Sequence, residues 1–368
     1  MLVCLGSIGY GSAVTTRAII GTLTSVSALV AFACSSDGDT TPIDPTADAG
    51  TGPVWVTEAA VPTQAQLLSV WGRAADDLWA VGWDGTIIHY DGETWTQETT
   101  TATVPLTGVS GLPLPGNLGP EEPRPDPVVF AVGWNGTILQ RNPDGTWVPA
   151  TVSEPINENL FGLALGDDDV GLAVGDNGRI VAWDGMAWTP QPLEVPGEFS
   201  GDIIQPKGTL QRVWTQNGNR FYVTGSGGAA YRSEQGLTRF EAIDTRISDP
   251  LRGVWGTGNN NVYAVGLDGL ILRFSGGQWR RVSNNGADAL PAVFLFGVAG
   301  TGGNDITIVG WQGTVARFDG DSWVVEETDS TVDLRDVWVD TATDAAFAVG
   351  ASGTVLQRDF STDLPAMQ

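Results

Sequence analysis

Residues 251–279 form the stretch LRGVWGTGNNNVYAVGLDGLILRFSGGQW, in which four short strand patterns alternate with three turns. The turns are rich in glycine, asparagine and aspartate, and Asp268-Gly269 is a two-residue hairpin signal. The fourth strand begins with Trp279. A unit of this size cannot bury both faces of its sheet alone, so it requires neighbours of its own kind.

The chain supplies these neighbours as a repeat marked by the glycine that ends each AVG-type strand. Every copy has an L-x-x-[VL] strand before this glycine and a turn after it, and most copies end in a Gly-x-x-Trp segment. Four-stranded units spaced by 40 to 51 residues are typical of a β-propeller, in which radial closure protects the sheet edges. The marking glycines are Gly82, Gly133, Gly175, Gly225, Gly266, Gly310 and Gly350.

The two ends of the repeat region predict how the ring closes. The last copy ends near Phe360 without a Gly-x-x-Trp strand, whereas Val54-Trp55 precedes the first copy without a repeat of its own. We therefore expect residues 52–59 to form the outer strand of the seventh blade. The predicted fold is all-β: a seven-bladed β-propeller of four-stranded antiparallel blades over residues 52–360, closed by this N-terminal outer strand. Residues 361–368 are predicted to be a C-terminal tail.

Side-chain alternation predicts how the blades stack. In the first AVG strand, Trp79 and Val81 point to one face, and Ala80 and Gly82 point to the other. A bulky face on one blade then meets the small face of the next blade.

The N-terminal segment resembles a bacterial lipoprotein signal. An apolar run over residues 18–33 follows Arg17 and ends at Ala31-Phe32-Ala33-Cys34, which is similar to a lipobox. This pattern predicts a signal peptide over residues 1–33 and lipidation of Cys34. Residues 34–51 would form a flexible acidic tether on an exported protein of the periplasm, outer membrane or cell surface. An ordinary secretory signal cut near the same place is the alternative.

Charge and cysteine content narrow the classes of function. The formal net charge is −25, and Lys207 is the single lysine. Such an acidic chain repels nucleic acid and anionic lipid headgroups. If the signal is removed, Cys4 leaves with it and Cys34 carries lipid, so no disulfide is expected.

The sequence offers no catalytic constellation, and we expect neither a metal site nor a cofactor. The single histidine, His89, occupies a strand position that other copies fill with glutamine or arginine. Asp167-Asp168-Asp169 could attract Ca²⁺, but it matches the turn between two strands in other copies. A glycosidase-like pair of carboxylates remains open because acidic residues are plentiful.

Three tryptophans are the candidate ligand platform. Trp83, Trp134 and Trp311 each come directly after a marking glycine, in blades one, two and six. Indoles on one rim could stack against sugars or peptides. However, alternation puts Trp83 on the same face as Val81, which favours packing between blades instead. The long connections 189–209 and 280–294 are expected on the same face of the disc as the hairpin turns, and residues 111–127 form an insertion in blade two.

Two turns carry a resemblance to known propellers. Residues 90–95 (YDGETW) and 318–323 (FDGDSW) resemble the Asp-box of bacterial-neuraminidase-repeat propellers. Over residues 52–360 the repeat is similar to myxobacterial repeat lipoproteins and, more distantly, to photosystem II stability and assembly factor propellers. The resemblance implies the propeller fold and carries over no enzymatic activity.

These observations favour a non-enzymatic, membrane-tethered, monomeric propeller that acts as a binding scaffold at the cell envelope. Its partner would be a protein, peptide or glycan on the loop-bearing face. The first alternative is a carbohydrate-active enzyme with a carboxylate pair near the central channel. The second alternative is an assembly factor for a membrane complex.

Overall fold

The computed structural model describes residues 54–115, 123–167, 169–192, 195–196, 203–204, 208–234, 237, 239–283 and 290–359. The predicted signal peptide, Cys34, the tether and the C-terminal tail lie outside the described residues. Within the described part of the chain, no helical segment has the length and apolarity needed to cross a bilayer.

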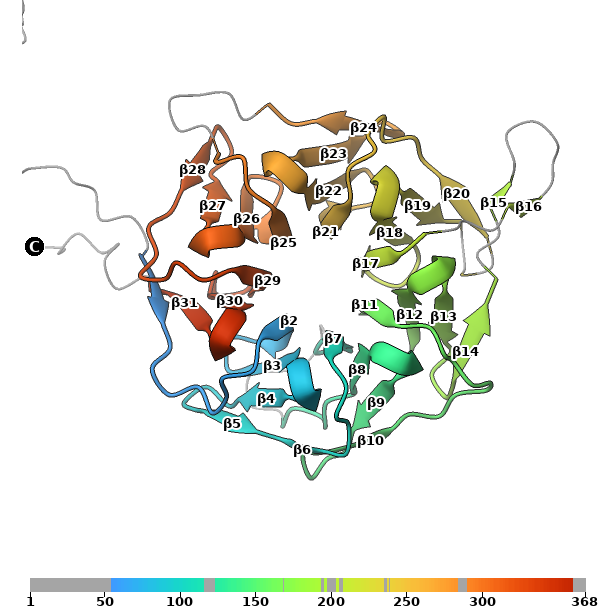
Figure 1. The fold of residues 1–368 in the computed structure, drawn as a ribbon, viewed down its shortest axis with the longest axis vertical. Helices are drawn as coiled ribbons and strands as arrows, with labels where there is room; N and C mark the ends of the chain where they lie inside the picture. The colour runs from blue at the N-terminus through green and yellow to red at the C-terminus, as the bar shows by residue number, and fades with distance from the viewer. Residues whose placement is uncertain are drawn as a thin grey trace, which may run out of the picture. The chain divides into compact units, whose positions relative to one another are not determined.

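Seven antiparallel sheets are arranged around a central channel, with the first strand of each blade innermost (Figure 1). Blade one contains β2 (Leu67–Ala74), β3 (Asp77–Gly82), β4 (Ile87–Tyr90) and β5 (Trp95–Gln97). Blade two contains β7 (Leu106–Gly111), β8 (Val129–Gly133), β9 (Ile138–Arg141) and β10 (Thr146–Pro149). Blade three contains β11 (Leu160–Gly166), β12 (Val170–Gly175), β13 (Ile180–Trp183) and β14 (Trp188–Gln191). Blade four contains β17 (Leu210–Thr215), β18 (Phe221–Gly225), β19 (Ala230–Ser233) and β20 (Phe240–Ala242). Blade five contains β21 (Leu251–Gly258), β22 (Asn261–Gly266), β23 (Ile271–Ser275) and β24 (Gln278–Arg281). Blade six contains β25 (Leu295–Gly302), β26 (Asp305–Gly310), β27 (Val315–Phe318) and β28 (Trp323–Val325).

The seventh blade is assembled from both ends of the ring. It contains β29 (Leu334–Val339), β30 (Ala346–Gly350), β31 (Val355–Asp359) and β1 (Val54–Thr57). β1 pairs antiparallel with β31, and Trp55 lies opposite Arg358. The predicted closure is therefore confirmed for the described residues, and the predicted fold class with it.

Two short additions extend the predicted blades. β6 (Thr99–Thr100) runs parallel to β10 and adds a fifth strand to the sheet of blade two. β15 (Val195–Pro196) and β16 (Ile203–Ile204) form a small hairpin in the connection from blade three to blade four.

The glycine that marks each repeat is followed by a tight 3₁₀-type turn. In η1 (Trp83–Gly85), Asp84 and Gly85 have φ of 57° and 69°, as the Asp-Gly hairpin signal predicts. A Cβ atom at Gly85 would lie 2.0 Å from the carbonyl oxygen of Ala102, so only glycine fits. The same turn recurs as η2 (Trp134–Gly136), η3 (Asp176–Gly178), η4 (Ser226–Gly228), η5 (Leu267–Gly269), η6 (Trp311–Gly313) and η7 (Ala351–Gly353).

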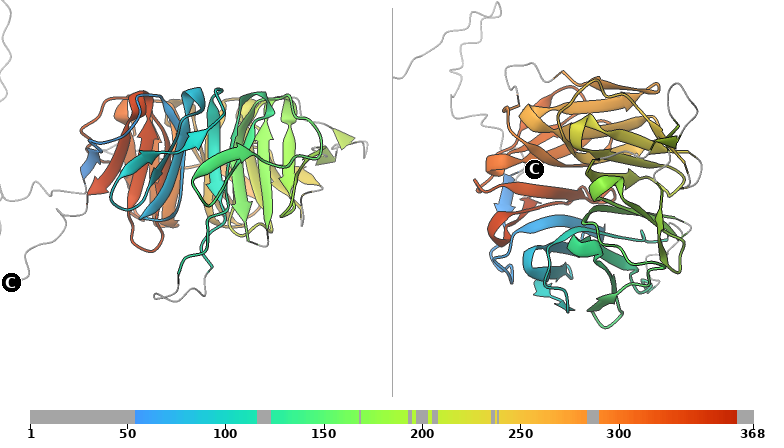
Figure 2. Two further views of the ribbon diagram at one scale, coloured as in Figure 1. Left: turned by 90° about the horizontal axis from the view of Figure 1, so that it is seen from below. Right: turned by 45° about the vertical axis from the view of Figure 1, so that its right-hand side comes forward.

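These turns mark one face of the disc, which we call the turn face. Inter-blade connections reach the same face, since the amide of Trp83 donates to the carbonyl of Gln66, the residue before β2. The described ends of the blade-two insertion, residues 112–115 and 123–127, instead extend from the opposite face (Figure 2). Arg124 of this insertion pairs with Asp76 of blade one, with Nη1 2.6 Å from Oδ1.

Hydrophobic clusters form between adjacent blades, as the alternation predicts. Trp79 and Val81 of blade one pack with Val129 and Ala131 of blade two. Near the channel, tryptophans of the first strands lie against glycines of the next blade. A Cβ atom on Gly111 would come within 2.6 Å of the Trp71 ring, so the indole occupies space that only glycine leaves.

Candidate functional site

The first strand of every blade carries a β-bulge directly after its opening leucine. In blade five, Leu251 pairs with Gly266 but Gly253 pairs with Val265, so Arg252 is the additional residue. A bulge re-aims a side chain. Here all seven additional residues line a hollow of about 460 Å³ at the channel mouth on the turn face. They are Leu68, Thr107, Phe161, Gln211, Arg252, Phe296 and Arg335.

Three guanidinium groups meet at this hollow, and we call them the arginine mouth: Arg212, Arg252 and Arg335. Arg212 reaches across the channel, donating from Nη1 to the carbonyl of Phe161 (3.1 Å) and from Nη2 to that of Leu68 (3.3 Å). The walls of the channel thus hold one of the three charges in a fixed position.

In the part of the chain that the structure describes, the guanidinium groups of the other two arginines have fewer hydrogen-bond acceptors than that of Arg212. Arg252 donates to the side-chain oxygen of Gln211 at 2.8 Å. Arg335 pairs with Asp333 at 3.2 Å and lies 4.4 Å from the Phe296 ring centre. Nε of Arg252 and of Arg335 is buried without a hydrogen-bond partner among the described residues.

The three positive charges at the mouth repel one another. Burial lowers the pKa of Arg252, and the charges of Arg212 and Arg335 lower it further. Burial also lowers the pKa of Arg335, although Asp333 opposes this effect. Arginine nonetheless stays protonated. An anion entering the hollow would relieve the repulsion among the three charges.

Below the mouth, Asp336 stands in the channel wall where four other blades have glycine. Ser69 donates to its Oδ2 at 2.8 Å, and the Val70 amide donates to the same oxygen at 3.2 Å. Part of Asp336 is accessible from the channel, but the surrounding walls desolvate its carboxylate. This burial raises the pKa of Asp336 and outweighs the opposing effect of Arg212 and of the hydrogen bonds.

The three candidate tryptophans lie on the turn face with 38–40% of their surface exposed. Trp83 and Trp134 contact each other edge to face at 5.7 Å, and both line the hollow. Trp311 lies outside the hollow but packs against Phe294 and Phe296 at 4.4 and 6.3 Å. The alternation that favoured packing between blades is wrong here, because the strand ends at the marking glycine and the turn redirects the next side chain.

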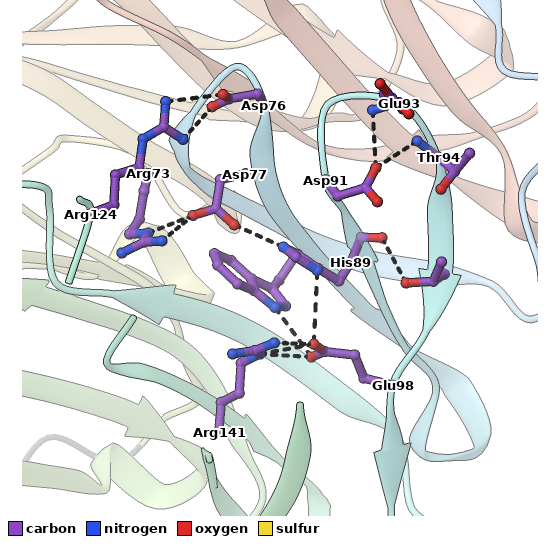
Figure 3. A network of polar contacts seen from close by, with 12 residues as sticks. Arg73, Asp76, Asp77, His89, Asp91, Glu93, Thr94, Glu98, Arg124 and Arg141 are labelled. Carbon is purple, nitrogen blue, oxygen red and sulfur yellow. Dashed lines mark hydrogen bonds and ion pairs between the residues drawn. The ribbon is translucent and has the colours of Figure 1, made fainter. Parts of the chain in front are cut away.

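His89 belongs to a polar network between blades one and two rather than to the channel (Figure 3). Its Nε2 lies 2.8 Å from Oδ1 of Asp77, and its ring stacks on Trp79 at 4.5 Å. Burial raises the pKa of Asp77, but bonding with His89 and the charge of Arg73 outweigh it, so the pKa lies below its ordinary value. Blades five and six have a hydrogen-bonded pair at the same place, formed by Arg273 with Asn261 and by Arg317 with Asp305. His89 is therefore a structural strand residue, as predicted.

The acidic turn of blade three connects β11 and β12. Asp169 has φ of 55°, which is the left-handed conformation of a tight turn, whereas Asp168 lies outside the described residues. Among the described residues, no group of three histidine, cysteine or acidic side chains has the arrangement of a metal site.

The arginine mouth was missed by sequence reasoning. A signal exists, because Arg252 and Arg335 occupy the same position after the opening leucine of their repeats, and Arg212 follows one residue later. Arginines in one register of a strongly acidic repeat protein indicate a shared location.

Solved structures share this fold. Two structures of YCF48, one bound to D1 peptide and one from Cyanidioschyzon merolae, align with TM-scores of 0.62 at 17% and 14% identity. Each alignment covers 83% of this chain, and 96% and 98% of the respective YCF48 chain. The WD40 β-propeller domain of Doa1 aligns with a TM-score of 0.60 at 14% identity, covering 85% of this chain and 99% of that domain. No family model and no curated protein matches the sequence.

Proposed function

We propose that this propeller is a non-enzymatic binding scaffold that holds an acidic peptide on its turn face, with a peptide carboxylate at the arginine mouth. The observation that carries the proposal is the convergence of Arg212, Arg252 and Arg335 on one hollow of a chain whose net charge is −25. Arginine forks suit carboxylates because they can form two parallel charge-assisted hydrogen bonds.

The surroundings of the mouth suit a polypeptide ligand. Trp83 and Trp134 provide exposed rigid aromatic surface beside the charges, which is common at protein interfaces. A hollow of about 460 Å³ accommodates a few side chains. A propeller of similar fold, YCF48, has been solved bound to D1 peptide, which supports a peptide as the class of ligand.

Binding can be measured by fluorescence anisotropy with a fluorescein-labelled, C-terminally amidated hexaglutamate peptide. We expect Arg252→Gln/Arg335→Gln to weaken binding at least tenfold, since hydrogen bonds to charged groups contribute about 1.5–3 kcal/mol each. The exposed Arg239→Gln variant is the control and should bind like the parent protein. Equal affinity of the double variant and the control would contradict the proposal.

Membrane tethering through Cys34 is part of the proposed role, and it rests on the sequence pattern. A palmitate analogue supplied to cells expressing the full chain should label the parent protein and not Cys34→Ser. Labelling of the Cys34→Ser variant would show that Cys34 is not the lipidated residue. The variant should fractionate away from membranes, since one acyl-modified cysteine is its proposed anchor.

An assembly role for a membrane complex would follow from this function. It predicts that a stable envelope partner co-purifies with the parent chain and is lost with Arg252→Gln/Arg335→Gln. Turnover of glycans by the purified chain would instead favour the carbohydrate-active alternative.

A further inference from the structure

Two junctions between blades contain a buried glutamate at an equivalent place. Glu98, three residues after Trp95, accepts the indole N–H of Trp147 in the next blade at 2.7 Å. Glu326, three residues after Trp323, accepts the indole N–H of Trp55 in the next blade, also at 2.7 Å. At these junctions the repeat therefore places a carboxylate against the outer tryptophan.

An arginine completes each of these arrangements. Arg141 pairs with Glu98 at 2.5 Å, and Arg358 pairs with Glu326 at 3.1 Å. Each arginine lies directly opposite the outer tryptophan of its own blade in the strand register. The local environment is thus an indole N–H, a guanidinium and a carboxylate supplied from the preceding blade.

The junction between blades five and six lacks this carboxylate. Val282 stands three residues after Trp279, in the place that Glu98 and Glu326 take after Trp95 and Trp323. Phe318 lies opposite Trp323 in the register position of the arginine. Trp323 is only 6% exposed, and its indole N–H has no hydrogen-bond partner within the described part of the chain. A buried donor without an acceptor costs free energy that an incoming acceptor would recover.

At this junction the missing carboxylate coincides with a basic cleft. Val282, Phe318 and Trp323 line a hollow of about 320 Å³, and so do Arg273, Arg280 and Arg281. All three arginines are exposed, and Arg273 lies over the Tyr263 ring at 5.6 Å. Within the described residues, no carboxylate lies within ion-pairing distance of these three side chains. Trp95, Trp188 and Trp279 also lack an indole acceptor, so the cleft with its arginines is what distinguishes Trp323.

We propose that the cleft between blades five and six is a second binding site, which takes a glutamate or aspartate side chain of a partner polypeptide. The ligand carboxylate would occupy the place that Glu98 and Glu326 occupy at their own junctions. It would accept the Trp323 N–H and pair with Arg280 and Arg281. The cleft is built from outer strands, whereas the arginine mouth is built from inner strands, so either site can fail without the other.

The test uses the full chain with Arg252→Gln/Arg335→Gln as background, so that the amidated hexaglutamate peptide reports on the cleft. We expect residual binding that Arg280→Gln/Arg281→Gln weakens at least tenfold. Val282→Glu should weaken it to a similar extent, because the new side chain supplies the carboxylate internally. Val325→Glu, on an exposed position of β28, adds the same charge outside the cleft and should change affinity less than twofold.

A site-specific readout keeps the proposal testable if a variant folds poorly. The ¹⁵N–¹H signal of the Trp323 indole, assigned with Trp323→Phe, should shift on peptide addition in the background variant. No shift, or residual binding unaffected by Arg280→Gln/Arg281→Gln, would overturn the second site. The proposed function is tested separately, by the effect of Arg252→Gln/Arg335→Gln on the parent protein.

Discussion

Replacing Glu98 with alanine is expected to lower the free energy of unfolding by about 3–5 kcal/mol, the cost of breaking a buried ion pair. Glu98 is held between blades one and two (Figure 3). Its carboxylate accepts hydrogen bonds from Arg141, Trp79 and Trp147 at 2.5–3.2 Å. The side chains of Glu98 and Arg141 are only 8% and 10% exposed. Alanine would leave a desolvated guanidinium and two indole donors without this acceptor.

Urea unfolding followed by tryptophan fluorescence measures this loss as a lower midpoint. Glu98→Gln should lower the free energy of unfolding less than Glu98→Ala does, because the amide keeps an acceptor oxygen for the indoles. Glu93→Ala, an exposed position in the turn before β5, is the control and should lie within about 0.5 kcal/mol of the parent. A loss below about 1 kcal/mol for Glu98→Ala is the size of a surface ion pair and would mean that the network does not hold the two blades together.

Replacing Trp55 with alanine is expected to cost about 3–5 kcal/mol from lost packing, with a further loss from the hydrogen bond to Glu326. Trp55 is completely buried at the junction where the two ends of the ring meet. Its amide donates to the carbonyl of Glu327, and its indole donates to the Glu326 carboxylate. Weakening β1 also exposes the edge of β31. Unpaired edges promote association, so the variant should form oligomers on gel filtration.

Two matched variants separate the contributions of packing and of the indole hydrogen bond where β1 closes the ring. Trp55→Phe keeps most of the packing but removes the indole donor, so it should lose less than alanine does. Val56→Ala, on the same strand with 42% of its surface exposed, should change stability by about 0.5 kcal/mol or less. If Trp55→Ala unfolds at the same urea concentration as Val56→Ala, the closing strand contributes little to the stability of the ring.

The architecture was predictable because its signals are local and repeated. Each marking glycine and the turn after it can be recognised within a few residues, and the seven marking glycines give the number of blades. Closure by residues near Trp55 was predictable by elimination, since one blade lacked an outer strand and one strand lacked a blade. The exposed position of Trp83 was not predictable, because side-chain alternation applies only within a strand. The strand β3 ends at Gly82, one residue before Trp83.

The arginine mouth shows where sequence reasoning stopped. Arg212 and Arg335 are more than a hundred residues apart, and their similar positions in the repeat do not show by themselves that the side chains share a hollow. Their meeting depends on the bulge in each first strand and on the convergence of inner strands at the channel. Neither the bulge nor the missing carboxylate beside Trp323 leaves a pattern that is recognised without the register between strands and blades.

The class of fold, the number of blades and the order of the strands in each sheet follow from turn chemistry and periodicity along the chain. Which charges converge at the channel, and which buried donors meet a carboxylate, depends on the folded ring. Those contacts join side chains from different blades. Their free energies depend on distance and burial across the ring, which separation along the chain does not encode.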